Sequence, residues 1–474
     1  MRLKIFVTLL LFIGLADGAD AQSYKMVFKL DGVSDSVLYI GRHFRDQFQL
    51  QDSTRRGKDG SYTFQGKRKW GRGIYALVHQ GGEKAMGDFA IDDSREFTIT
   101  GDANLTPSTV KVKGSDANTQ MFAYMARWNE AKKQREEIGK RKKDAATKAR
   151  AEKEEQALMD EMDAYDRAAR HPRKSQVFFD LQNLFYDEPV PDSIEDKAYY
   201  FRSHYWDCLF SAENRGKWKT EELIYTPDLF KKMNFFFFGL LYHADSDTIC
   251  REIDRLATRI GSDTALLRYV FDYIEPRYYR STRNIGWDAV WCRLQEEYYQ
   301  KGRCPWVTEG NLYNMNHNYK RIRQSLIGSH GQELWMADTN QSDNPEEWIS
   351  SHRFPQKYVI LWFWDPDCHH CQEQSAELKT LYDSLLTTPN RPFEVYAVGY
   401  ENDVAKWKKY VREHDFRWVN VGGPNVNIDY QEAYNIHGAP TMIILNEQRD
   451  IIMNKVIPIK SLLKFLEDYE KKKK

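Results

Sequence analysis

The sequence predicts a multidomain α+β protein with three successive parts: a small antiparallel β domain, a mainly α-helical region and a C-terminal α/β sandwich. Three observations support this prediction. The chain of 474 residues is too long for one ordinary hydrophobic core. Apolar residues make up 41% of it, which is enough to form several cores. The pattern of apolar and polar residues also changes twice, near residues 112 and 328.

Residues 1–21 have the features of a signal peptide. Arg2 and Lys4 supply positive charge, residues 5–15 are largely apolar, and residues 19–21 fit a cleavage site. An apolar run of about eleven residues is too short to span a bilayer as a helix, which favours cleavage over a membrane anchor. We therefore expect an exported, soluble protein of the periplasm or cell envelope, with no transmembrane segment after cleavage.

The charge of the chain is balanced. It contains 69 basic and 69 acidic residues, so the formal net charge is zero. Nucleic-acid binding normally needs a basic surface to meet the phosphates. We therefore expect no nucleic-acid partner.

Residues 22–112 are expected to form the β domain. Short strand-like runs alternate with turn signals such as Asp59-Gly60 and Gly81-Gly82. The runs span residues 26–30, 36–40, 74–79 and 97–100. No catalytic arrangement is visible in this part, so binding or packing is its expected role.

Residues 113–328 are expected to be mainly helical. Lys, Arg, Glu and Ala dominate residues 115–170, and this composition predicts a solvated long helix or helical hairpin. Residues 249–267 then place Ile253, Leu256 and Ile260 at helical spacing, among aromatic-rich segments that we interpret as core.

Residues 329–474 alternate strands and helices, which is typical of a sheet covered by helices. The run 358–364 is continuously apolar, as expected of a central strand that is buried on both faces. Further along the chain, the pattern predicts a helix around 378–385, a strand at 393–398, a helix around 404–411, a hairpin of 441–445 with 451–453, and a terminal helix around 462–469.

Cys368 and Cys371 follow the central strand directly and carry the predicted chemistry. Two cysteines at this spacing at the start of a helix can close a disulfide within one turn. The first sulfur lies at the helix N-terminus, where the dipole and free N–H groups favour a thiolate. Cys368 is therefore the expected nucleophile, and Cys371 is expected to resolve the mixed disulfide.

His369 and His370 separate the two cysteines. A protonated or hydrogen-bonding imidazole would favour the Cys368 thiolate further and make the disulfide more oxidising. We therefore expect the pair to be more oxidising than thioredoxin, whose potential is about −270 mV.

The arrangement strand, Cys-x-x-Cys and helix, followed by Gly438-Ala439-Pro440-Thr441 ahead of another strand, resembles the thioredoxin superfamily. Within it, the chain is most similar to exported TlpA/ResA-like thiol–disulfide oxidoreductases, and its layout resembles a Bacteroidetes-type group of exported proteins. The resemblance implies a thioredoxin-like fold for 329–474 and dithiol–disulfide exchange. It also implies that Pro440 is a cis-proline that faces the dithiol and supports the substrate chain.

The sequence departs from the family pattern at two positions. The TlpA/ResA pattern often has a Glu three residues after the second cysteine, where this chain has Gln374. The buried Asp of thioredoxin is also missing, and Trp362 stands in that region. The route of the Cys371 proton is therefore open, with Asp365, Asp367, Glu373 or water as candidates.

Four further cysteines lie in the middle of the chain, at Cys208, Cys250, Cys292 and Cys304. They permit three disulfide pairings, and free buried thiols are equally compatible with the sequence.

Other interpretations of the motif are weaker. Neighbouring residues of the motif cannot easily all face one zinc ion, and no second ligand pair stands out nearby. A peroxidase would carry a Thr upstream of its nucleophile, where this chain has residues 365–367. The main alternative is an extracytoplasmic interaction or binding protein with a structural, non-catalytic thioredoxin-like domain. The oxidoreductase needs no cofactor or metal. Its expected partners are protein thiol or disulfide substrates and a redox partner that resets the dithiol.

Overall fold

The computed structural model describes residues 22–79, 85–144, 146–170, 176–186, 189–212, 214, 217–280, 284–400 and 403–473. The predicted signal peptide, residues 1–21, lies outside them. The chain forms two compact units, which divide between Tyr242 and His243. No helix in the described part of the chain is long and apolar enough to cross a membrane.

The first unit begins with two four-stranded sheets. Their strand orders are β4-β1-β7-β8 and β3-β2-β5-β6. The strands are β1 (Gln22–Asp31), β2 (Val37–Phe44), β3 (Gln47–Arg55), β4 (Tyr62–Arg68), β5 (Gly73–His79), β6 (Ala85–Ile91), β7 (Glu96–Asp102) and β8 (Lys111–Lys113). Alternate residues of β1, such as Met26 and Phe28, are fully buried, as a half-buried strand requires. The predicted β domain is confirmed, although the β1–β7 pair is parallel rather than antiparallel.

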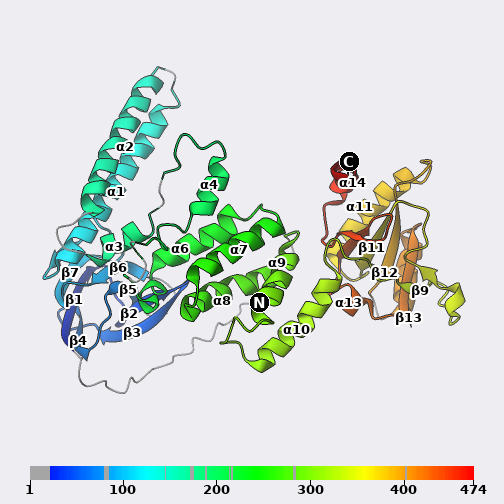
Figure 1. Ribbon diagram of the computed structural model, residues 1–474, viewed down its shortest axis with the longest axis horizontal. Helices are drawn as coiled ribbons and strands as arrows, with labels where there is room; N and C mark the ends of the chain where they lie inside the picture. The colour runs from blue at the N-terminus through cyan, green and yellow to red at the C-terminus, as the bar shows by residue number, and fades with distance from the viewer. Residues whose placement is uncertain are drawn as a thin grey trace. The chain divides into compact units, whose positions relative to one another are not determined.

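A helical hairpin follows the sheets. Its two arms are α1 (Asp116–Arg141) and α2 (Lys148–Arg170), in agreement with the prediction of a charged helix or hairpin (Figure 1). Ion pairs such as Arg135–Glu155, at 3.0 Å, join the arms. The unit ends with α3 (Val177–Leu184), α4 (Lys197–His204), α5 (Thr220–Leu223), α6 (Pro227–Phe235) and the π-helical turn η1 (Phe236–Leu240).

The second unit begins with a helical layer that continues the predicted helical region. It contains α7 (Ser246–Ile260), α8 (Thr264–Arg280), α9 (Trp287–Leu294), the π-helical turn η2 (Gln295–Tyr299) and α10 (Glu309–Gln324). The buried face of α7 carries Ile249, Ile253, Leu256 and Ile260, which includes the apolar positions that the sequence pattern identified.

The rest of the second unit is built on a seven-stranded sheet with the order β10-β9-β13-β12-β11-β14-β15 (Figure 1). The strands are β9 (Trp335–Asp338), β10 (Ile349–Ser350), β11 (Tyr358–Trp364), β12 (Phe393–Gly399), β13 (Val419–Val426), β14 (Thr441–Leu445) and β15 (Ile451–Met453). The helices are α11 (His369–Leu385), α12 (Val404–Glu413), α13 (Tyr430–Ala433) and α14 (Leu462–Lys473), with 3₁₀ turns η3 (Pro345–Glu347) and η4 (Ile459–Ser461).

The central strand β11 is buried along its whole length. It pairs in parallel with β12 and antiparallel with β14. Alternate side chains of β11 enter two separate hydrophobic clusters, one on each face of the sheet. The predicted central strand is therefore confirmed, and its carboxyl end leads straight into the cysteine motif.

The segment just before this sheet is bonded to its edge strand. The Gly328 N–H donates to Ile451 O, and the Ile451 N–H donates to Ser329 O, each across 2.8 Å. The Asn454 side-chain amide donates to Asp288 at 2.6 Å and to the Ser325 carbonyl at 2.9 Å. Residues 325–329 are thus tied both to β15 and, through Asn454, to α9.

Candidate active site

Cys368 is the N-cap residue of α11, so its sulfur lies at the start of the helix, as the sequence predicted. The chain leaves β11 at Trp364, and the Cys368 N–H donates to the Asp365 carbonyl, which closes the turn between strand and helix. Cys368 is partly exposed. The N–H groups at the start of a helix have no partners within the helix and favour an anion beside them.

Cys371 lies in the first turn of α11 and is fully buried. Burial raises the pKa of its thiol to about 12, and the hydrogen bond with Cys368 contributes to the rise. The negative charge of Asp365 raises this pKa further, whereas a backbone hydrogen bond at Asp365 lowers it. At neutral pH, Cys371 is therefore a thiol that must lose a proton before it can attack another sulfur.

The two cysteines thus differ in access. Cys368 is a partly exposed thiol, while Cys371 is part of the core cluster beneath it. All six cysteines of the chain lie in the described part, and none of them forms a disulfide there. Burial raises the pKa of Cys250, Cys292 and Cys304, which disfavours thiolates at those positions.

His369 and His370 are both exposed and lie beside Glu373. The distances are 3.2 Å from His369 Nε2 to Glu373 Oε1 and 3.6 Å from His370 Nδ1 to Glu373 Oε2. Glu373 thus gathers the two imidazoles on the outer face of the first helical turn. Their predicted effect on the Cys368 thiolate stays a prediction.

The candidate proton-handling acids have different surroundings. Asp367 forms an ion pair with Lys406, and Glu373 faces the two imidazoles. Asp365 is half-buried and is the carboxylate whose charge acts on Cys371. Gln374 occupies the position where the resembled family often has Glu. Its Oε1 is buried and has no hydrogen-bond partner among the described residues.

The loop before β14 lies opposite Cys368. The Cys368 thiol donates a hydrogen bond to the Ala439 carbonyl oxygen across 3.6 Å. The Ala439–Pro440 peptide bond is cis, in agreement with the expected conformation at Pro440. The role of Pro440 in holding a substrate chain stays a prediction.

Two residues near the dithiol were not predicted. The Ser375 hydroxyl accepts a hydrogen bond from Trp362 Nε1 at 3.0 Å, and both side chains are fully buried. Tyr410 of α12 packs against the core cluster that contains Cys371. Burial raises the pKa of Tyr410, and the charge of a Cys371 thiolate would add to the rise. The spacing of Tyr410 from Trp407 and Val411 was the available signal, since all three lie on one side of α12.

Comparison with known proteins identifies the C-terminal fold. Residues 356–451 match a family model described as thioredoxin-like. No curated protein gives a significant match to the chain. The second unit therefore contains a C-terminal thioredoxin-like domain, and Cys368 and Cys371 lie within the matched residues.

Three solved structures are similar to parts of the chain. A thioredoxin-like protein from Bacteroides caccae is 16% identical, with a TM-score of 0.45, and the match covers 60% of this chain and 98% of that one. A domain of a possible thiol-disulfide isomerase from Cytophaga hutchinsonii is 31% identical over 31% of this chain and 95% of that one, with a TM-score of 0.27. The thioredoxin domain of a thiol-disulfide oxidoreductase from Bacteroides vulgatus is 23% identical over 30% and 96%, with a TM-score of 0.26.

Proposed function

We propose that the chain is an exported thiol–disulfide oxidoreductase that exchanges disulfides with protein thiols through Cys368 and Cys371. The observation that carries the proposal is the pairing of a partly exposed thiol at a helix N-terminus with a buried thiol one turn away. The first thiol can reach another protein, whereas the second can reach only the first. This asymmetry is what a two-step exchange requires.

In the reducing direction, the Cys368 thiolate attacks one sulfur of a substrate disulfide. A mixed disulfide forms, and the other substrate sulfur leaves as a thiolate that takes up a proton. Cys371 then loses its proton and attacks the Cys368 sulfur, which releases the second substrate thiolate. Two electrons have passed to the substrate, and a Cys368–Cys371 disulfide remains. A redox partner must then reduce this disulfide, and with an oxidising partner the same steps run backwards.

Asp365 is the proposed acceptor of the Cys371 proton. A thiol with a pKa near 12 contributes almost no thiolate at neutral pH, so the second step needs a base nearby. Asp365 stands in the turn that joins β11 to the motif, and its charge acts directly on Cys371. Asp367 and Glu373 are engaged with Lys406 and the two histidines instead.

A trapping experiment tests the proposed function. A Cys371→Ala variant leaves the mixed disulfide unresolved, so the variant should accumulate covalent, reductant-sensitive complexes with proteins of the cell envelope. A Cys368→Ser variant should trap nothing and should lose insulin-disulfide reduction. The matched control is Cys208→Ser, because a hydroxyl can keep the hydrogen bond that Cys208 donates to the Asn183 carbonyl at 3.0 Å.

If Cys368→Ser retains the activity of the Cys208→Ser control, the exchange function is wrong. The chain would then be an interaction protein whose thioredoxin-like domain is structural. Export is tested separately, by sequencing the N-terminus of the secreted protein. Cleavage after Ala21 is expected, and recovery of the intact N-terminus from the cytoplasm would contradict it.

A further inference from the structure

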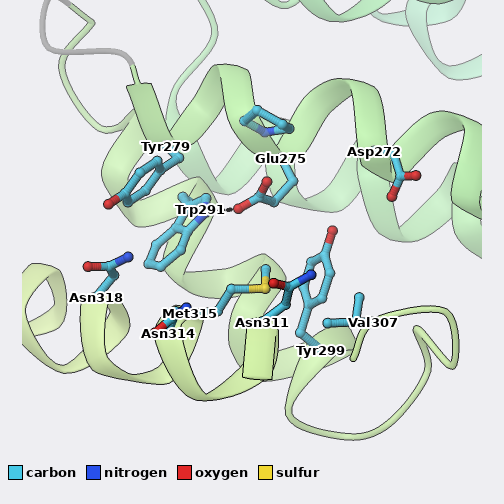
Figure 2. Close-up of a pocket in the computed structure, with 11 residues that line it drawn as sticks. Asp272, Glu275, Tyr279, Trp291, Tyr299, Val307, Asn311, Asn314, Met315 and Asn318 are labelled. Atoms are coloured by element: carbon cyan, nitrogen blue, oxygen red, sulfur yellow. Dashed lines mark hydrogen bonds between the residues drawn. The ribbon is translucent and has the colours of Figure 1, made fainter. Parts of the chain in front are cut away.

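A cleft in the helical layer of the second unit is lined by acidic, aromatic and amide side chains. Its volume is about 350 Å³, and it lies between α8 and α10, as Figure 2 shows. The lining contains two carboxylates, three aromatic rings and three asparagines. These residues are Asp272, Glu275, Tyr279, Trp291, Tyr299, Asn311, Asn314 and Asn318.

The charged side chains of the lining are all negative. None of the described residues that line the cleft is Lys, Arg or His. Arg268, outside the lining, pairs with Asp272 at 3.1 Å and offsets part of the charge. Tyr299 gives independent support, because the charges of Glu275 and Asp272 both add to the rise in its pKa that burial causes. The negative charges of both carboxylates are therefore felt at Tyr299, inside the cleft.

The carboxylates are held in place by two indole N–H groups, from the buried Trp291 and the half-buried Trp306. Trp291 Nε1 donates to Glu275 Oε1 at 2.7 Å, a bond that Figure 2 shows, and Trp306 Nε1 donates to Asp272 Oδ1 at 3.0 Å. Only 1% of Trp291 is exposed, so its ring belongs to the floor of the cleft. Preorganised acids of this kind bind a cation with little loss of side-chain freedom.

The opposite wall is the face of α10 that carries Asn311, Asn314 and Asn318. Residues at these spacings follow one side of a helix, and Figure 2 shows them along the lower edge of the cleft. Their side-chain amides make no hydrogen bond within the described part of the chain. Tyr279, 39% exposed, stands at the rim, where an aromatic ring can receive a cation.

We propose that this cleft binds an organic cation on an alkyl stem, such as the ammonium or guanidinium group of a Lys or Arg side chain or a free polyamine. Glu275 and Asp272 would meet the charge, Tyr279 would cover the stem, and the asparagine carbonyls would accept the remaining N–H groups. A neutral saccharide fits less well, because Trp291 and Tyr299 are too deeply buried to offer a stacking face. The site does not depend on the dithiol or on the proposed exchange function.

Calorimetric titration of the full-length reduced protein tests the proposal. The probes are N-acetyl-lysine methylamide, N-acetyl-arginine methylamide, spermidine and the uncharged N-acetyl-norleucine methylamide. We expect the cations to bind at least about tenfold more tightly than norleucine, roughly 1.4 kcal/mol, with affinity that falls as salt is added. Preference for the amino-acid probes would indicate a polypeptide ligand, and preference for spermidine would indicate a free amine.

Glu275→Gln removes the charge but keeps an acceptor for the Trp291 N–H, and Asp272→Asn does the same for Trp306. Each should weaken lysine-probe binding about tenfold. The matched control is Glu309→Gln, which removes an exposed carboxylate from the start of α10 outside the lining. Four results would each overturn the proposal. The lysine and norleucine probes bind equally, both pocket variants keep full affinity, or a neutral saccharide binds independently of salt. The fourth is that no probe binds at 10 mM, roughly the weak limit for such ligands.

Discussion

The Cys368 thiol and the Ala439 carbonyl oxygen are joined by a hydrogen bond of 3.6 Å between residues 71 positions apart. The contact brings the N-terminus of α11 against the loop that precedes β14. In the proposed exchange, a substrate disulfide at Cys368 would therefore lie beside this carbonyl. In an extended substrate, a backbone N–H is the group that could bind to it. A polypeptide substrate is therefore what we expect if the proposed exchange on protein thiols takes place.

Asp365→Asn should slow resolution of the mixed disulfide at neutral pH by about tenfold or more, because the base is lost. The same change should lower the pKa of Cys371, because the charge of Asp365 raises it. Quenched-flow measurement of the second step gives the rate, and an NMR titration of the Cys371 Cβ resonance in a Cys368→Ser background gives the pKa. If Asp365 had only a structural role, the substitution would not both slow the second step and lower the pKa of Cys371. Asp367→Asn is the matched control.

The redox potential of the Cys368–Cys371 pair should be less negative than about −270 mV, the thioredoxin value. Replacing His369 and His370 together by Asn should make it more negative, by roughly 30 mV for each 1.4 kcal/mol of lost thiolate stabilisation. Equilibration with glutathione buffers measures both values. A wild-type potential below that of thioredoxin, or a double variant with no shift, would contradict the proposed role of the imidazoles.

The reduced protein should lose stability as the pH rises above the ordinary cysteine range. The pKa of Cys371 is about 12 in the folded state, whereas an unfolded cysteine titrates near about 8.5. The protonated Cys371 thiol therefore makes its full contribution to the free energy of unfolding below about pH 8.5. This contribution declines towards pH 12, by up to about 1.4 kcal/mol per pH unit. Urea unfolding at pH 7.5 and 10 measures this decline. A Cys371→Ala variant should lose less unfolding free energy between these two pH values. If the variant and the wild type lose the same amount, the expectation is refuted.

Ser375→Ala should destabilise the thioredoxin-like domain by about 1–3 kcal/mol, because it leaves the buried Trp362 Nε1–H without an acceptor. Hydrogen exchange of the β11 amides measures the effect within this domain and avoids assuming one unfolding transition for the whole chain. Ser384→Ala, an exposed site on the same helix, should change exchange little. Equal protection in the two variants would show that the Trp362–Ser375 bond contributes nothing measurable.

The sequence pattern predicted the elements that are buried or strongly periodic. The continuously apolar β11 and the four-residue steps of α11 are examples, because burial on both faces or along one stripe leaves a clear signature. It did not predict β13, whose Gly422, Gly423 and Pro424 are normally strand breakers. It also missed the parallel pairing of β1 with β7, because such a pairing joins residues far apart in the chain.

Within the candidate site, the spacing of the cysteines was sufficient to place Cys368 at the N-cap and Cys371 in the first turn. The spacing could not choose between Asp365, Asp367 and Glu373, because the path of a short turn decides which carboxylate faces the buried thiol. The spacing of Tyr410 from Trp407 and Val411 indicated a residue on the packed side of its helix, but it could not show that this helix lies beside the dithiol.

The backbone bonds of Gly328 and Ser329 to Ile451 affect any truncated version of the thioredoxin-like domain. Strand β15 is the last strand of the sheet, and residues 328–330 cover its open side. In a fragment that begins at residue 331, the Ile451 N–H and carbonyl groups would have no backbone partners. The exposed edge of β15 could then pair with strands of other molecules, which promotes aggregation. A fragment that begins before Ser325 keeps this cover and is the better choice for recombinant expression.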